Sequence, residues 1–447
     1  MTGVTGATGV VVAADAASLP RSLEVPSHVT SAASTEEIRE TRLANGIRVV
    51  TERMPEARSV ALGVWVAVGG RDEPDQLAGA SHFLEHLLFK GTPTRTARQI
   101  AEAIDAVGGE MNAFTSREHT AYYTRLPAHR VGLGLDILGD VLTDPAFRPH
   151  EVEAERQVIL EEILMNLDMP EDHVHTLLAE AMFPGHPLGR EVLGTRQSVE
   201  AVTRDQLTEF FGHWYRPRNL VIVAAGNLSH EQLVDGFDRS LGRREGGERP
   251  LRQRPTSDPN PRVVLGDPTE QVHVAVGWRG VDHHDDDRYA LMVANQVLGG
   301  GMSSRLFQEV REQRGLAYSV YSWASTYNDS GSAGIYAGTA PARAGELLEV
   351  VDDEVAKLVA SGVTESELGV AKGFIEGSLV LGLEDSASRM ARLGRTLMAR
   401  DEIVTVDDQL ARIRAVTADD VGAVAARVYG SDRSLAVIGR VDDGLLG

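Results

Sequence analysis

The feature that most restricts the fold of this chain is an internal repeat. Ala201-Val202-Thr203 precedes "RDQLTEFFGHWYRPRNLVIVAAGN", and Ala415-Val416-Thr417, 214 residues later, precedes "ADDVGAVAARVYGSDRSLAVIGR". A second pair of similar segments begins at Phe147 and Val363, which are 216 residues apart. Two independent segments with nearly the same offset indicate two copies of one structural unit.

Both copies mix strand patterns with helix patterns. In the first copy, Asn45-Gly46 within "TRLANGIRVVTERM" predicts a hairpin, and "EMNAFTSREHTAYYTRLP" predicts two further strands. Helices are predicted over "TARQIAEAIDAVGG", "RVGLGLDILGDVLTDP" and "HEVEAERQVILEEILMNL". We therefore expect an α+β fold of two homologous domains, each a mixed, mainly antiparallel sheet covered by helices.

A polar stretch separates the two copies. Residues 243–262, "RREGGERPLRQRPTSDPNPR", are rich in Pro, Gly and charge and predict a linker between a domain at 39–242 and a domain at 263–447. Residues 1–38 are rich in Gly, Ala, Ser and Thr and lack the basic start of a secretory signal. They predict a flexible extension on a cytoplasmic protein.

Composition excludes several kinds of site and partner. The chain has no cysteine, so it has no disulfides and no thiolate ligands, and any metal must be held by His, Asp or Glu. The net charge of −21 argues against nucleic acid or an anionic membrane surface as the main partner. No apolar run reaches the length that crosses a membrane.

The segment "GASHFLEHLLFKG" contains two histidines four residues apart, His82 and His86, with Glu85 between them. On a helix, side chains at this spacing share one face, so both imidazoles can reach one ion. A catalytic zinc keeps three protein ligands and lowers the pKa of a coordinated water to about 7, and a nearby carboxylate then acts as general base. The apolar residues around the histidines also fit a buried helix that holds no metal.

The best source of a third ligand is the helix predicted after Pro149. Glu155 and Glu162 are seven residues apart on one face, and we expect Val158 and Ile159 to lie between them on the same face as an apolar stripe. Buried carboxylates without a partner are costly, so a cation between them and the histidines would stabilise the arrangement. A solvated acidic helix is the alternative. Other possible ligands are His119, His173 and His175, the last two expected in a loop or strand at the surface, and the polar turn 283–287.

The second copy lacks the groups that would carry this chemistry. It contains no His-x-x-Glu-His, and Ser378 stands where the first copy has Glu162. We therefore expect one metal site per chain, in the first domain.

His82-Phe83-Leu84-Glu85-His86 is the inverted zinc-protease motif His-x-x-Glu-His. Together with "GTPTRTARQIAEAIDAVGGEMNAFTSREHTAYY" and "ERQVILEEI", it makes the chain resemble the pitrilysin-type zinc metallopeptidases over about residues 40–440. The branch it resembles most is the mitochondrial processing peptidase group with its bacterial relatives. The resemblance implies that His82, His86 and Glu162 bind one zinc ion, that Glu85 is the general base, and that Glu155 supports a ligand.

The resemblance also implies how a substrate is held. "MNAFTS" is similar to the edge strand on which the family binds its substrate by β-addition, with Asn112, Ala113 and Phe114 at the substrate. "SSRLFQEVREQRGLAYSVYS" is similar to the C-terminal signature of the family, and its Arg311 and Tyr318 would hold the substrate and stabilise the oxyanion.

In this family a two-domain chain is half of a clamshell, and its second, inactive domain completes the chamber of another chain. The resemblance therefore implies a homodimer in which Arg311 and Tyr318 of one chain complete the site of the other. The implied function is a zinc-dependent endopeptidase that cleaves short or unfolded polypeptides, bound as an extended strand in a closed chamber. The alternative is a non-catalytic structural or peptide-binding subunit of the same fold.

Overall fold

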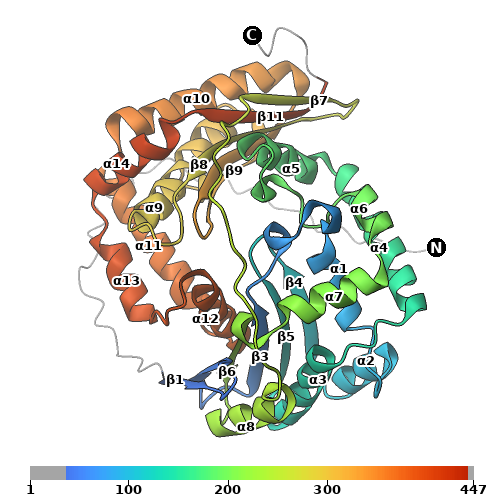
Figure 1. Ribbon diagram of the computed structural model, residues 1–447. Coiled ribbons are helices and arrows are strands. Elements are labelled where there is room, and N and C mark those ends of the chain that lie inside the picture. The colour runs from blue at the N-terminus through green and yellow to red at the C-terminus, as the bar shows by residue number, and fades with distance from the viewer. Residues whose placement is uncertain (1–36, 441–447) are drawn as a thin grey trace, which may run out of the picture. The chain divides into compact units, whose positions relative to one another are not determined.

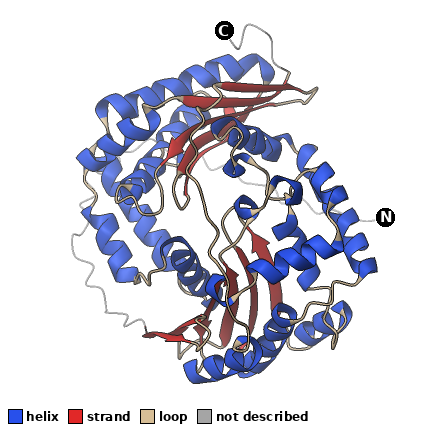
Figure 2. Ribbon diagram, viewed as in Figure 1, coloured by secondary structure: helices blue, strands red, loops and turns tan. Residues whose placement is uncertain are grey.

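A computed structural model describes residues 37–440 of the chain. Residues 1–36, almost the whole of the predicted extension, and residues 441–447 lie outside the described part. Two sheets, each covered by helices, make up the fold, as expected for an α+β protein (Figures 1 and 2). None of the described helices combines the length and the apolar character needed to cross a membrane.

The first sheet has six strands in the order β1-β2-β6-β3-β5-β4. In that order they are β1 (Glu37–Arg42), β2 (Arg48–Arg53), β6 (Leu220–Gly226), β3 (Ser59–Val66), β5 (Thr120–Pro127) and β4 (Glu110–Thr115). Only the pair β2–β6 is parallel, and β4 forms one edge. One face packs on the main core of the first half, which is built with the helices α1 (Ala80–Leu88), α2 (Ala97–Asp105), α3 (Val131–Thr143), α4 (Pro149–Leu167), α7 (Arg204–Trp214) and α8 (His230–Leu241).

The second sheet repeats the first without a counterpart of β1. Its order is β7-β11-β8-β10-β9, and its parallel pair is β7–β11, which corresponds to β2–β6. The strands are β7 (Arg262–Gly266), β11 (Arg433–Gly439), β8 (Val272–Gly280), β10 (Gly331–Thr339) and β9 (Ala317–Thr326). The helices of this half are α9 (Arg288–Gly299), α10 (Ala344–Ser361), α11 (Glu365–Gly382), α13 (Val406–Ala415) and α14 (Ala418–Tyr429), with a π-helix at Phe307–Gln313. The matching strand order agrees with the internal repeat found in the sequence.

Each half contributes one helix to the sheet of the other half. Helix α5 (Pro170–Met182) buries Leu178 and Met182 against the second sheet, and α12 (Ser386–Arg400) buries Met390 and Leu393 against the first. The two helices start 216 residues apart, which is the offset of the repeat. The halves are therefore interlocked, because the apolar face of each sheet opposite its own helices is covered by the other half.

The predicted linker has no regular secondary structure, but it is firmly attached to both halves. Arg252 donates hydrogen bonds to Asp72 at 2.8 and 2.9 Å and to the backbone oxygen of Glu118 at 2.7 Å. Arg254 of the same segment donates a hydrogen bond to the backbone oxygen of Asp329 in the second half at 2.8 Å. Arg71 of the first half bonds Glu118 at 2.6 Å and the Asp329 carboxylate at 2.7 Å. This segment is thus a junction built around buried ion pairs, whereas its richness in Pro, Gly and charge predicted only a linker. The domain limits at 242 and 263 stay predictions.

Candidate metal centre

Helix α1 carries the His-x-x-Glu-His motif, and its start is defined by a buried carboxylate. Gly79 precedes the helix with a φ of 91°, a left-handed conformation that suits glycine. Glu73, which is 4% exposed, accepts hydrogen bonds from the backbone N–H groups of Gly79 at 2.7 Å and Ser81 at 2.6 Å. A carboxylate at a helix N-terminus satisfies N–H groups that the helix itself leaves free.

Packing divides helix α1 into two faces. Phe83, Leu84, Leu87 and Leu88 are at most 1% exposed and form core. The three polar residues of the motif face the other way and are partly exposed: His82, Glu85 and His86. One face of the helix is therefore core, as the apolar residues indicated, and the other face carries the candidate metal site.

Helix α4 brings the two predicted carboxylates beside α1. Glu155 is 5% exposed, and Ile159 on the same helix is fully buried. Val158 is 43% exposed, so its predicted place on the same apolar stripe is wrong. The contact with α1 turns the helix so that Glu155, Ile159 and Glu162 face inward while Val158 faces solvent.

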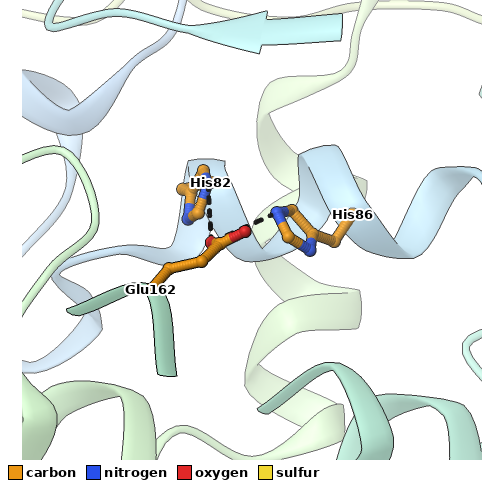
Figure 3. A group of neighbouring side chains, drawn as sticks. All are labelled: His82, His86 and Glu162. Carbon is orange, nitrogen blue, oxygen red and sulfur yellow. Dashed lines mark ion pairs between the residues drawn. The ribbon is translucent and has the colours of Figure 1, made fainter. Parts of the chain in front are cut away.

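The three predicted ligands converge on one point (Figure 3). Glu162 Oε2 lies 3.7 Å from His82 Nε2 and 3.6 Å from His86 Nε2. This carboxylate oxygen is buried and has no hydrogen-bond partner among the described residues. Zinc bonds of about 2.0–2.1 Å in a tetrahedral site place neighbouring ligand atoms about 3.4 Å apart. The spacing and the missing partner both fit a small divalent cation.

The pKa of His82 favours the binding of a cation at this site. Burial, with the nearby His86 adding to it, lowers the pKa of His82 to about 4, so its imidazole is neutral near pH 7 and can act as a ligand. Burial raises the pKa of Glu85, and a hydrogen bond from the Thr115 hydroxyl, 2.6 Å from Glu85 Oε2, opposes that shift. Glu85 lies next to His86 in the motif, but it is not one of the three side chains whose ligand atoms converge.

The other predicted ligands lie elsewhere. His173 and His175 belong to helix α5 and not to a loop or strand, because the apolar side chains around them continue a helical pattern against the second sheet. His175 Nε2 lies 2.9 Å from the Tyr321 hydroxyl. The ring of His119 lies 5.3 Å from that of Trp65, and His283 Nδ1 lies 2.7 Å from the Thr326 hydroxyl.

The predicted substrate residues lie on β4, at the edge of the first sheet. Ala113 belongs to the core shared with α1, whereas the ring of Phe114 lies 5.5 Å from that of Trp65 on the opposite face. Asn112 is exposed. A binding role for these three residues stays a prediction.

Arg311 and Tyr318 lie on the second half. The Arg311 guanidinium sits over the Tyr318 ring at 4.3 Å, and Tyr318 is 79% exposed. Within the described part of the chain, no hydrogen bond, ion pair or ring contact joins either residue to the ligands or to Glu85. The roles that the resemblance implies for them stay predictions.

Sequence reasoning missed two polar residues next to the site, Glu73 and Thr115. The only signal for Glu73 was an acidic residue a few positions before a helix, which is common. No sequence signal marks Thr115, because its partner Glu85 lies 30 residues away and is reached only through the fold.

Comparison with known proteins agrees with this geometry. Residues 48–196 match the family model described as Insulinase (Peptidase family M16), and residues 201–373 match the model described as Peptidase M16 inactive domain. A protein of Streptomyces coelicolor described as an uncharacterized zinc protease is 47% identical over 414 residues, which cover 91% of this chain and 90% of that protein. The chain belongs to peptidase family M16.

Other relatives of this M16 chain carry similar descriptions. An uncharacterized zinc protease of Mycobacterium tuberculosis is 46% identical over 90% of this chain and 93% of that protein. One of Bacillus subtilis is 39% identical over 88% of this chain and 96% of that protein. The resemblance to pitrilysin-type zinc metallopeptidases is thereby confirmed at the level of the family, while the closer likeness to the mitochondrial processing peptidase group stays a prediction.

Solved structures confirm the fold of the M16 chain. A protease from Helicobacter pylori has a TM-score of 0.84 at 21% identity and covers 90% of this chain and 99% of that one. A structure from Pseudomonas fluorescens titled as a peptidase M16 inactive domain also has a TM-score of 0.84 at 21% identity, with coverage of 91% and 99%. At this identity the likeness bears on the fold alone.

Proposed function

We propose that this chain is a zinc-dependent endopeptidase that cleaves short or unfolded polypeptides. The observation that carries the proposal is the buried Oε2 of Glu162, which has no hydrogen-bond partner among the described residues and lies 3.6–3.7 Å from two histidine nitrogens. Such an arrangement is costly without a cation. The descriptions of the relatives as zinc proteases support zinc as that cation.

His82, His86 and Glu162 would hold one zinc ion per chain. When bound, zinc polarises the scissile carbonyl and lowers the pKa of a water molecule. Glu85 takes a proton from the attacking water and passes it to the leaving amine nitrogen. The Thr115 hydroxyl, 2.6 Å from Glu85 Oε2, holds that carboxylate in place. The carboxylate of Glu155, 3.0 Å from His86 Nδ1, orients the imidazole.

The substrate would add a strand to the free edge of β4. An edge strand presents unpaired N–H and C=O groups, and a peptide in extended form can pair with them regardless of its sequence. Thr115 at the end of β4 bonds Glu85, so the edge runs directly past the candidate base. Asn112, Ala113 and Phe114 would contact the bound peptide.

A second copy of the chain would complete the site as a homodimer, closing the clamshell. The exposed Tyr318, with Arg311 stacked on its ring, supports this part of the proposal, because a partner chain can reach both side chains. There the guanidinium would stabilise the oxyanion. The cytoplasmic location inferred from the sequence stays a prediction.

The test is a cleavage assay with quenched unstructured peptides, combined with measurement of bound zinc. We expect the wild type to bind about one zinc per chain and to cleave, Glu85→Gln to keep zinc and lose cleavage by at least about a hundredfold, and Glu162→Gln to lose zinc. Glu161→Gln is the matched control, since Glu161 is exposed on the same helix.

Two outcomes would contradict the proposal. Zinc binding without cleavage by the purified wild type would favour the non-catalytic, peptide-binding alternative. Cleavage that persists undiminished in Glu85→Gln would place the chemistry at another site.

A further inference from the structure

The two sides of β4 face different surroundings. On one side the Thr115 hydroxyl bonds Glu85, and on the other the Phe114 ring packs on Trp65. The strand pairing agrees, because Phe114 lies opposite Ala121, and Ala121 lies opposite Trp65. A peptide paired with this edge would alternate in the same way, so every second side chain would face the side covered by α12.

A cavity of about 610 Å³ lies on that side, between the first sheet and the helices α11 to α13. Phe114 and Tyr123 of the first sheet line it, together with Arg392, Arg395 and Gln409 of the second half. Figure 1 shows α12 alongside the strands of the first sheet. The cavity therefore lies against the same strand on which the substrate is proposed to dock.

The lining of this cavity is positively charged. It contains two arginines and no carboxylate. The guanidinium of Arg392 already has partners within the chain, because it donates a hydrogen bond to the backbone oxygen of Val404 at 2.7 Å and lies 3.7 Å from Glu52 Oε2. An acidic group that entered the cavity would meet no like charge from its walls.

Arg395 is the available cation. Within residues 37–440 its guanidinium forms no hydrogen bond and no ion pair, and its side chain is exposed. A second cavity, of about 600 Å³, also borders Arg395, and its one carboxylate, Glu118, is held by Arg71 at 2.6 Å and by the backbone N–H of Asn328.

Arginine is suited to one kind of ligand. Its five N–H donors form a planar fork that binds a carboxylate through two parallel hydrogen bonds. The aromatic rings of Phe114 and Tyr123, which line the same cavity as Arg395, would cover the aliphatic part of a bound side chain. The long-range field of the protein repels anions, so a preference for an acidic group must come from a local contact.

We propose that Arg395 and this cavity form a specificity subsite that binds a carboxylate of the peptide substrate, on the side of the substrate strand that faces α12. The inference rests on the proposed peptidase function. The carboxylate is either an acidic side chain or the C-terminus of a short peptide.

The test compares matched quenched peptides that carry Glu, Gln or Lys at successive positions, each with a free and an amidated C-terminus. For the wild type we expect kcat/KM to be about tenfold higher for Glu than for Gln at one position and lower still for Lys. In Arg395→Gln the ratio of Glu to Gln falls to about one, and Arg395→Lys restores part of it. Arg98→Gln is the control for loss of one positive charge, because Arg98 has 87% of its side chain exposed on α2.

The outcomes separate the subsite from the peptidase function. Cleavage by the wild type without any carboxylate preference, or with a preference that survives in Arg395→Gln, overturns the subsite. If kcat/KM depends on Arg395 for peptides with a free C-terminus but not for the amidated peptides, the bound carboxylate is the C-terminus of the peptide.

If the wild type cleaves nothing, the proposed function fails, and binding then decides the subsite. Fluorescence anisotropy of labelled Glu and Gln peptides measures it on the same four proteins. Tighter binding of the Glu peptide that depends on Arg395 supports the subsite, and equal binding overturns it.

Discussion

Glu155 Oε2 lies 3.0 Å from His86 Nδ1, and the other oxygen of the same carboxylate lies 2.6 Å from Lys90 Nζ. Because a carboxylate only accepts, Nδ1 of His86 carries a proton, and Nε2 is the ring nitrogen that faces Glu162. A residue that ligates nothing thus selects the tautomer in which His86 can bind a metal.

This pairing predicts the effect of Glu155→Ala. Loss of the acceptor frees the tautomer and the orientation of the imidazole, so zinc affinity should fall by about 10–100-fold. Competition with a fluorescent zinc chelator measures the change. Glu161→Ala on the exposed side of the same helix should leave the affinity within about twofold, and an equal loss in both variants would contradict the role of Glu155.

The buried Oε2 of Glu162, which accepts no hydrogen bond from the described residues, predicts opposite effects on stability with and without zinc. In metal-free protein, Glu162→Gln removes a carboxylate whose buried oxygen accepts no hydrogen bond within residues 37–440, so its Tm should equal or exceed that of the wild type by about 1–3 °C. With zinc in excess the wild type should gain Tm and the variant should not, because only the wild type binds the ion. Differential scanning calorimetry with and without a chelator distinguishes these cases. A lower Tm for the metal-free variant would show that the carboxylate has a structural partner instead.

The buried junction between the halves predicts a loss of stability in acid. Burial alone would raise the pKa of Glu118, but His283, Arg252, the Asn328 N–H and Arg71 outweigh it and hold that pKa at about 2. A carboxyl whose folded pKa lies below its unfolded value of about 4.3 stabilises the fold fully above that value and loses the contribution as the pH falls toward 2.

Glu118→Gln tests this at the junction itself. The variant should be less stable than the wild type by about 3 kcal/mol at pH 7, and this difference should shrink as the pH falls from about 4.5 to 3. Urea unfolding followed by tryptophan fluorescence gives both values. A difference that does not depend on pH would mean that Glu118 acts through packing and not through its charge.

The contact between α12 and the first sheet predicts a severe effect of Gly394→Ala. A Cβ at Gly394 would lie 2.0 Å from Cε2 of the fully buried Trp65, so the helix must move away from the sheet. We expect a loss of at least about 2 kcal/mol. Gly377→Ala is the control, because a Cβ there meets nothing within 4 Å and alanine favours a helix by about 1 kcal/mol. Thermal unfolding of both variants measures the difference, and similar Tm values would contradict the close packing of α12.

Local and periodic features could be predicted from the sequence alone. The spacing of His82 and His86 places both on one helix face whatever surrounds the helix, and the repeat offset predicted two like units, which the matching strand orders bear out. The strands at 110–115 and 120–127 also follow from alternation and turn residues. These patterns depend on the backbone geometry of a few neighbouring residues, so they do not require knowledge of distant contacts.

Relationships between distant segments needed the tertiary structure. Val158 and Ile159 look alike in sequence, and only the packing of α4 on α1 decides that Ile159 is core and Val158 is exposed. The exchange of α5 and α12, the anchoring of the junction by Arg252 and the cavity beside Arg395 join residues that are far apart in the chain. Contacts between residues so far apart in the chain are determined by shape, burial and charge in the folded protein, so a local sequence pattern cannot predict them.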